Sequence, residues 1–418
     1  MSGARAAVGA AAIAAAAAAA ALTALATFTA LAAVSVFIAP AALAAPSTPA
    51  GDDEVVERLP LRAGSAAERS RLRAQQRVLA EQPHDLGLAL RAAREAIERS
   101  RRTGDPRDLG TAQAWLQPWW SDAAAPPAAR WLKATILQAQ HDFDPALAEL
   151  DRLLSERALP PALRAQVELT RAAVLQVRGR WAEARAGCER LAAPPLALPH
   201  GLACLAELDS LQGRDAAAGD RLAALDRAPQ APHAWLALLQ AERAEREGRP
   251  QAGALYAKAL TLDDSLYVRA AQADWLLDAG RPAQAAALLR AGQPATIEPM
   301  LAALPDALLL RLAIAWRRLD DPGAAAARQE LQARFDAAAL RGDAGHARER
   351  ARFALDVLGD APLALRQAQL NWALQREPAD ALLLLRAAQA AGRPAAAQPV
   401  RDFVSEQGLR DHRLQGLP

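Results

Sequence analysis

From about residue 83 onward, apolar and polar positions recur in blocks of about 34 residues. Each block holds an apolar stripe of helical spacing, then a Gly-Arg turn, then an alanine-rich second stretch. Such turns begin at glycines 179, 213, 248, 280 and 392, and the first four of these are separated by 34, 35 and 32 residues. The pattern therefore predicts a series of helix–turn–helix units, because few folds have that period.

Alanines recur at two fixed places in each block. The small residue inside each first helix is Ala134, Ala172, Ala206, Ala241 or Ala273, and the small residue that opens each second helix is Ala146, Ala184, Ala218, Ala252 or Ala285. This pattern resembles the tetratricopeptide repeat (TPR) family, whose unit has about 34 residues. The resemblance implies an all-α fold, a right-handed TPR-like α-solenoid with about eight to nine helix pairs over residues 83–418. The segments 83–120 and 295–350 match the pattern poorly.

A helix pair of this kind cannot bury its apolar stripe alone, so neighbouring pairs stack and share one elongated core. Alanine at the crossing points lets the helix axes approach to near the lower end of the usual range of roughly 8–10 Å. Such a scaffold is expected to be open, with contacts only between neighbouring repeats.

The first 45 residues are a candidate export signal. Arg5 is the only charge before Gly51, and Ala42-Leu43-Ala44 precedes Ala45-Pro46 as a cleavage site of small residues. The apolar run exceeds the length of an ordinary signal, so an uncleaved membrane anchor over 6–45 is the alternative. Residues 46–82 then form a flexible tether and a leading basic helix around 65–80.

Composition and charge narrow the possible functions. Alanine dominates an apolar fraction of 52%, and alanine favours helices over strands. A net charge of +2, from 49 basic and 47 acidic residues, is not that of a nucleic-acid-binding protein. The apolar fraction is also too high for a disordered chain.

The chain has two cysteines, Cys188 and Cys204, on consecutive helices of neighbouring units. Consecutive helices lie side by side in such a stack, so a disulfide is geometrically plausible in an exported protein. The alternative is a pair of free, buried thiols that act as small apolar side chains.

No catalytic, metal-binding or cofactor-binding pattern stands out, and we expect no enzyme activity and no cofactor. The six histidines lack metal-ligand spacing. His141, Asp142 and Asp144 bring three potential ligands together, but they fall in a turn between two helices, where such residues are common. Paired carboxylates that converge only in the folded chain are invisible in the sequence.

A binding surface follows from the register of the first helices. With the small residue as reference, the positions one, four and five residues later, and those three and six residues earlier, face the concave side, which is the usual recognition surface. The predicted protein-binding groove comprises Trp131, Gln138, Gln176, Glu207, Ser210, Trp235, Glu242, Glu245, Arg246, Tyr267, Asp274 and Asp278. From 207 to 278 it contains five acidic residues and one basic residue, so we expect it to suit a basic or amino-bearing peptide.

These observations predict a non-catalytic scaffold of the bacterial cell envelope, periplasmic or secreted, that binds a protein or peptide in its groove. We expect membrane contact only through the N-terminal segment, if it stays uncleaved. One alternative is an all-helical, toroid-like hydrolase or lyase acting on envelope polysaccharide. Such an enzyme would bring its ends together around facing carboxylates. A third alternative is a structural spacer anchored in the membrane.

Overall fold

The computed structural model describes residues 51, 53–54, 66–341 and 346–415. The predicted signal or anchor at residues 1–45 lies outside the described residues. Contacts divide the chain into a unit of residues 1–54 and 338–343 and a unit of residues 55–337 and 344–418. In the smaller unit, the N–H of Glu54 donates to the carbonyl of Gly51 (3.1 Å), and residues 338–340 end a helix. All the contacts below lie within the larger unit.

Apart from turns and loops, the described residues are helical, and no strand occurs among them. The first part holds α2 (Ala66–Glu81), α3 (Leu86–Thr103), α4 (Arg107–Trp115), α5 (Gln117–Trp120), α6 (Pro127–Ala139), α7 (Phe143–Ser155), α8 (Pro161–Val177), α9 (Trp181–Ala192), α10 (Pro199–Leu211) and α11 (Asp215–Asp226). Next come α12 (His233–Arg246), α13 (Ala252–Leu262), α14 (Leu266–Asp278), α15 (Pro282–Arg290), α16 (Ile297–Ala303), α17 (Asp306–Arg318) and α18 (Ala324–Leu340). The last part holds α19 (Ala347–Arg352), the π-helical turn η1 (Phe353–Leu358), α20 (Ala361–Leu374), α21 (Pro378–Ala390), the 3-10 turn η2 (Pro394–Ala397), α22 (Gln398–Gln407) and the 3-10 turn η3 (His412–Leu414).

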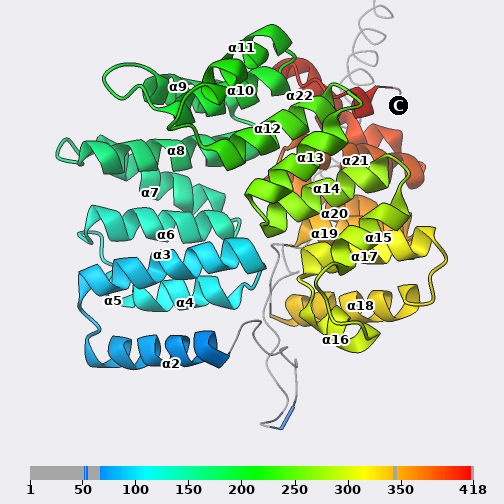
Figure 1. Cartoon of the computed structure of the whole chain (residues 1–418), viewed down its shortest axis with the longest axis horizontal. Coiled ribbons are helices and arrows are strands. Elements are labelled where there is room, and N and C mark those ends of the chain that lie inside the picture. Colours follow the sequence, from blue (N-terminus) through cyan, green and yellow to red (C-terminus); the bar gives the residue numbers. More distant parts are fainter. Residues whose placement is uncertain (1–50, 52, 55–65, 342–345, 416–418) are drawn as a thin grey trace, which may run out of the picture. The chain divides into compact units, whose positions relative to one another are not determined.

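Consecutive helices pack as pairs, and each pair packs on the next (Figure 1). The regular units are α6/α7, α8/α9, α10/α11, α12/α13 and α14/α15. Proline begins several of these helices. The first N–H groups of a helix have no acceptor within the helix, so a proline at that position costs no hydrogen bond. The prediction of an all-α, TPR-like solenoid is confirmed. The poor match at 295–350 has a visible cause, because the short helix α16 interrupts the pairing there.

The alanines singled out in the sequence lie at the centres of the helix crossings. All ten of them are at most 1% exposed. A methyl group fills the narrow space where two helices of a pair cross, and a larger side chain would overpack it.

The glycines of the Gly-Arg turns adopt the left-handed conformation that ends a helix. Their φ angles lie between +63° at Gly392 and +75° at Gly179, a region that residues with a Cβ rarely adopt. His141 takes the same place in the turn between α6 and α7, with φ of +65°. The repeat thus needs a positive φ at this point, and glycine provides it most easily.

Cys188 of α9 and Cys204 of α10 form a disulfide, with their Cα atoms 5.8 Å apart. Both side chains are buried, at 0% and 3% exposure. Of the two alternatives that the sequence left open, the structure has the bridge, which joins two successive repeats.

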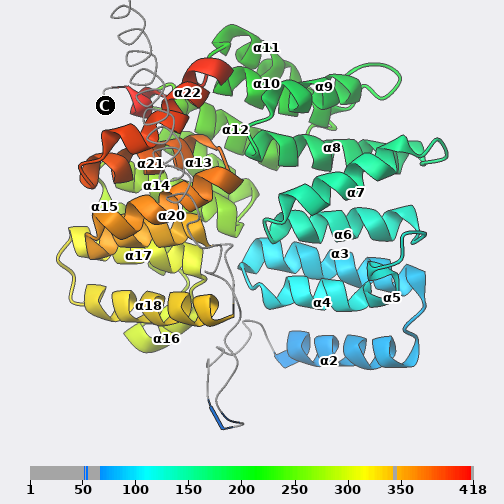
Figure 2. The same ribbon diagram turned by 180° about the vertical axis from the view of Figure 1, so that it is seen from behind.

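The expectation that contacts join only neighbouring repeats is wrong. The C-terminal helices lie against the middle repeats, and α22 is beside α10 and α12 in both views (Figures 1 and 2). The backbone N–H of Arg376 donates to the carbonyl of Val177, and that of Arg410 donates to Leu211, both at 2.8 Å. Val177 and Leu211 each lie two residues before the glycine of a turn, so the C-terminal part uses equivalent acceptors of successive repeats.

Apolar packing accompanies these hydrogen bonds. The ring of Phe403 in α22 lies edge-on to Trp181 of α9 and to Trp372 of α20, with centroids 5.3 Å apart in each case. At the other end of the stack, a Cβ added to Gly104 would lie 2.6 Å from Leu266, so the end of α3 also touches α14. Burial of these side chains explains why the repeats do not stay extended.

No helix of the described part is both long and apolar enough to cross a membrane.

Candidate functional site

The inner sides of α10, α12 and α14 present a column of carboxylates. Glu207, Glu242 and Asp274 each follow directly after the buried alanine of their helix. Because the helices stack in register, this position recurs at the same height in successive repeats. We call Glu207, Glu242 and Tyr267 the acidic site.

Glu242 and Tyr267 contact each other, since the Tyr267 hydroxyl donates to Oε1 of Glu242 at 3.0 Å. Glu207 accepts a hydrogen bond from the side chain of Gln176 and lies within electrostatic range of Glu242. Tyr267 is 56% exposed, although charged groups of α10, of α12 and of Glu377 all act on it. Solvent therefore reaches the site at Tyr267.

Burial and mutual repulsion raise the pKa values of these carboxyl groups. The pKa of Glu207 rises to about 8, mainly through loss of solvation and then through the charges of Glu242 and Glu377. Arg246 and Gln176 oppose the rise only in part. Burial also raises the pKa of Glu242. Among the described residues, neither carboxylate has an ion-pair partner, and Arg246 acts on both only through space.

The other predicted acidic residues are already paired. Glu245 accepts from Tyr256 (2.6 Å) and from Arg413 (2.7 Å), and Arg413 also lies 3.6 Å from Asp278. The pKa of Glu245 nevertheless rises to about 7, because burial outweighs Arg413. Asp274 binds both Arg311 and Arg352, and its pKa is lowered by those charges despite its burial.

Three members of the predicted groove are too buried to touch a partner. Ser210 is 5% exposed, Arg246 is 8% exposed and Glu245 is 9% exposed. The hydroxyl of Ser210 accepts hydrogen bonds from Nε and Nη2 of Arg246, which ties α10 to α12. The expectation that these residues form a contact surface is corrected to a structural role, because the stacking of the two helices encloses them.

The predicted tryptophans are packed between repeats and do not stand free. The indole N–H of Trp131 donates to the hydroxyl of Thr170 at 3.0 Å, and its side chain packs against two apolar clusters. Trp235 packs at the junction of two clusters, 6.3 Å from the ring of His200. Gln138 is partly exposed on α6. The structure thus joins Gln176, Glu207, Glu242 and Tyr267 in one place and leaves Trp131 and Gln138 outside it.

Several charged residues around the site come from the C-terminal part and were not predicted. Arg413 lies 168 residues beyond its partner Glu245. Glu377 caps α21 and pairs with Arg348, which also binds Asp380 at 2.6 Å. Only the alternation of arginine and glutamate near 348–352 marks this segment in the sequence as charged, and nothing local indicates where it docks.

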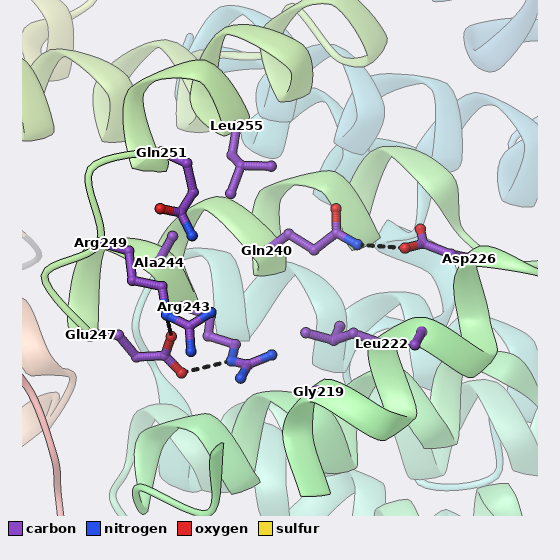
Figure 3. A pocket seen from close by; sticks show the side chains of 11 residues that line it. Gly219, Leu222, Asp226, Gln240, Arg243, Ala244, Glu247, Arg249, Gln251 and Leu255 are labelled. Atoms are coloured by element: carbon purple, nitrogen blue, oxygen red, sulfur yellow. Dashed lines mark hydrogen bonds and ion pairs between the residues drawn. The ribbon is translucent and has the colours of Figure 1, made fainter. Parts of the chain in front are cut away.

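A separate pocket of about 390 Å³ lies between α11, α12 and α13 (Figure 3). Its polar side chains bind one another: Gln240 donates to Asp226 at 2.9 Å, and Arg243 and Arg249 both pair with Glu247. Within the described residues, no group of three His, Cys, Asp or Glu side chains is placed to hold a metal ion.

No protein-family model matches the chain, and no curated protein sequence matches it. Among solved structures, it is similar to the crystal structure of the APC/C hetero-tetramer Cut9-Hcn1. The identity is 15%, the match covers 82% of this chain and 73% of that chain, and the TM-score is 0.40.

Proposed function

We propose that this protein is a non-catalytic interaction scaffold whose acidic site binds a basic segment of a partner protein or peptide. The segment would supply a lysine, an arginine or an amino terminus to the space between Glu207 and Glu242. Tyr267 would pack its exposed ring against the bound cation, an arrangement worth about 0.5–2 kcal/mol in proteins.

Within the described part of the chain, Glu207 and Glu242 make no ion pair, and this observation supports the proposal. Elsewhere on the inner face, Glu245, Asp274 and Asp380 each bind at least one arginine of the same chain. Two carboxylates held close together without an ion-pair contact are unfavourable, and a cation bound directly between them reduces that cost. A bound cation also lowers both pKa values, so binding releases protons near neutral pH.

The compartment belongs to this proposal as well. The apolar segment 6–45 and the small-residue site at 42–44 favour export to the cell envelope, where the protein would be periplasmic, secreted or anchored through that segment. The partner would then be an envelope protein or peptide rather than a nucleic acid.

A second candidate function is acid–base catalysis on an envelope polysaccharide. A glutamic acid with a pKa of about 8 carries its proton at neutral pH, which is the state a general acid requires, and Glu242 and the Tyr267 hydroxyl lie beside it. In its favour, the C-terminal helices close on the middle repeats. Release of reducing ends from purified envelope polysaccharide, lost in Glu207→Gln, would support this candidate over the scaffold.

Fluorescence anisotropy with a labelled lysine- and arginine-rich peptide tests the scaffold. We expect the variant Glu207→Gln/Glu242→Gln to bind about ten-fold or more weakly at low salt. The matched control is Glu298→Gln/Glu406→Gln, which removes two exposed carboxylates from α16 and α22. Wild-type affinity should rise as the pH passes through about 8, because Glu207 loses its proton there. Equal affinity of the two double variants for the peptide would contradict the proposal.

A further inference from the structure

Three arginines from different elements converge on one buried carboxylate, Asp209, near the end of α10. Nη2 of Arg185 in α9 and Nε of Arg214 in the following turn both donate to Oδ1, each at 2.8 Å. Nε of Arg221 in α11 donates to Oδ2 at 2.8 Å. Gln212 adds a neutral acceptor for Arg185 and Arg214. We call these three arginines with Asp209 the arginine triad.

The triad holds an excess of positive charge. Three guanidinium groups share a single carboxylate, so two positive charges are not balanced by any other ion pair of the described residues. At Arg413 the ratio of arginines to carboxylates is reversed, since this one guanidinium group contacts the carboxylates of Glu245, Asp278 and Asp411.

The carboxylate of Glu183 on α9 does not restore the balance. Glu183 is bound by Arg180 through two hydrogen bonds of 2.7 Å, and Arg171 also approaches it. Like charges held a few ångströms apart repel, and the repulsion is larger where solvent is partly excluded.

The layout of the triad leaves donors available. The side chain of Asp209 is 2% exposed and forms the base, whereas those of Arg185, Arg221 and Arg214 are 23%, 34% and 44% exposed. Asp209 and Gln212 occupy one or two nitrogens of each guanidinium group. The hydrogen bonds of the described residues use none of the remaining N–H groups, and a guanidinium group presents its N–H groups in a forked geometry that suits an oxyanion.

We propose that the arginine triad binds a phosphate-class oxyanion, either free phosphate or a phosphate ester. A dianion would balance the two excess charges and accept the N–H groups that Asp209 does not use. The phosphate could belong to a soluble metabolite or to a lipid headgroup, and the recognition chemistry is the same for both. This inference stands independently of the proposed peptide site, which involves none of these residues.

Isothermal titration of the full chain with inorganic phosphate, at constant ionic strength set with sodium chloride, tests the inference. We expect Arg185→Gln/Arg221→Gln to weaken phosphate binding about ten-fold or more, since two charged donors are lost. The matched control is Arg171→Gln/Arg190→Gln, which removes two arginines that have carboxylate partners, Asp151 and Glu168, and should bind phosphate like the wild type.

A third variant keeps the test decisive if the double variant is poorly folded. In Asp209→Asn a neutral amide replaces the carboxylate that competes with phosphate for the three arginines. Phosphate should therefore bind more tightly to this variant than to the wild type. Cosedimentation with phosphatidylcholine vesicles, with and without phosphatidic acid, distinguishes the sources. Triad-dependent binding to the acidic vesicles, without binding of inorganic phosphate, would assign the site to a headgroup. The inference is overturned if the wild type binds neither probe, or if Arg185→Gln/Arg221→Gln binds like its control.

Discussion

The substitution Arg413→Gln tests whether the C-terminal segment is held in place by its charge. Arg413 binds Glu245 at 2.7 Å and Asp411 at 2.6 Å, and those two carboxylate residues are only 9% and 4% exposed. Removing one partner of a buried ion pair costs about 3–5 kcal/mol, because the remaining charge keeps its desolvation penalty. Since Arg413 itself is 20% exposed, we expect the lower end of that range, about 3 kcal/mol.

Urea unfolding followed by circular dichroism provides the measurement. The loss should be larger at about pH 8 than at about pH 5, because the pKa of Glu245 is about 7 and its carboxyl group is neutral in the acidic sample. The exposed Arg393→Gln serves as the control and should change the free energy of unfolding by less than about 0.5 kcal/mol. If Arg413→Gln behaves like Arg393→Gln at both pH values, the segment is not anchored as described.

Three further predictions follow from the packing and the pKa shifts. Gly213→Ala should destabilise the protein more than Gly392→Ala. Both glycines have a positive φ, but only at Gly213 would the new Cβ meet the C-terminal segment, 2.5 Å from Cγ of Arg410. Urea midpoints of the two variants test this, and equal losses of stability would argue against the contact. Glu207→Gln should be more stable than the wild type at about pH 8. The folded-state pKa of about 8 lies above the ordinary value of 4.5 for a glutamate, so wild-type stability falls as the pH rises between these two values. A pH series of thermal unfolding that shows parallel curves for the two proteins would refute the raised pKa. Replacing Cys188 and Cys204 by serine removes a disulfide with a sequence separation of 16. The free energy of unfolding, measured by chemical denaturation, should fall by about 3 kcal/mol. No difference from the wild type under non-reducing conditions would contradict this.

The regular part of the fold was predictable because its determinants are local. An alanine at each crossing and a glycine at each turn are required by close helix packing and by a positive φ, so both leave a visible period in the sequence. The return of the C-terminal helices was not predictable. The acceptors at Val177 and Leu211 are backbone carbonyls, which carry no residue signature, and their donors lie about 200 residues away in sequence.

The acidic site was predictable in position but not in charge. Counting residues from the small alanine places Glu207, Glu242 and Tyr267 on the inner side, and the structure brings them together. The same count gives five acidic residues for one basic residue, whereas Arg311, Arg352 and Arg413 arrive from the C-terminal part and neutralise three of the five. Only the tertiary fold distinguishes the paired carboxylates from Glu207 and Glu242, which make no ion pair with the described residues.

The scaffold proposal depends on Glu207 and Glu242 making no ion pair with the described residues until a partner supplies a cation. The most direct measurement is a carbon-detected NMR titration of the glutamate carboxyl groups, assigned with Glu207→Gln, without and with a saturating basic peptide. We expect a pKa near 8 for Glu207 in the free protein, and a value below about 7 when the peptide is bound. A value near 4.5 in the free protein, or one that the peptide leaves unchanged, would contradict it.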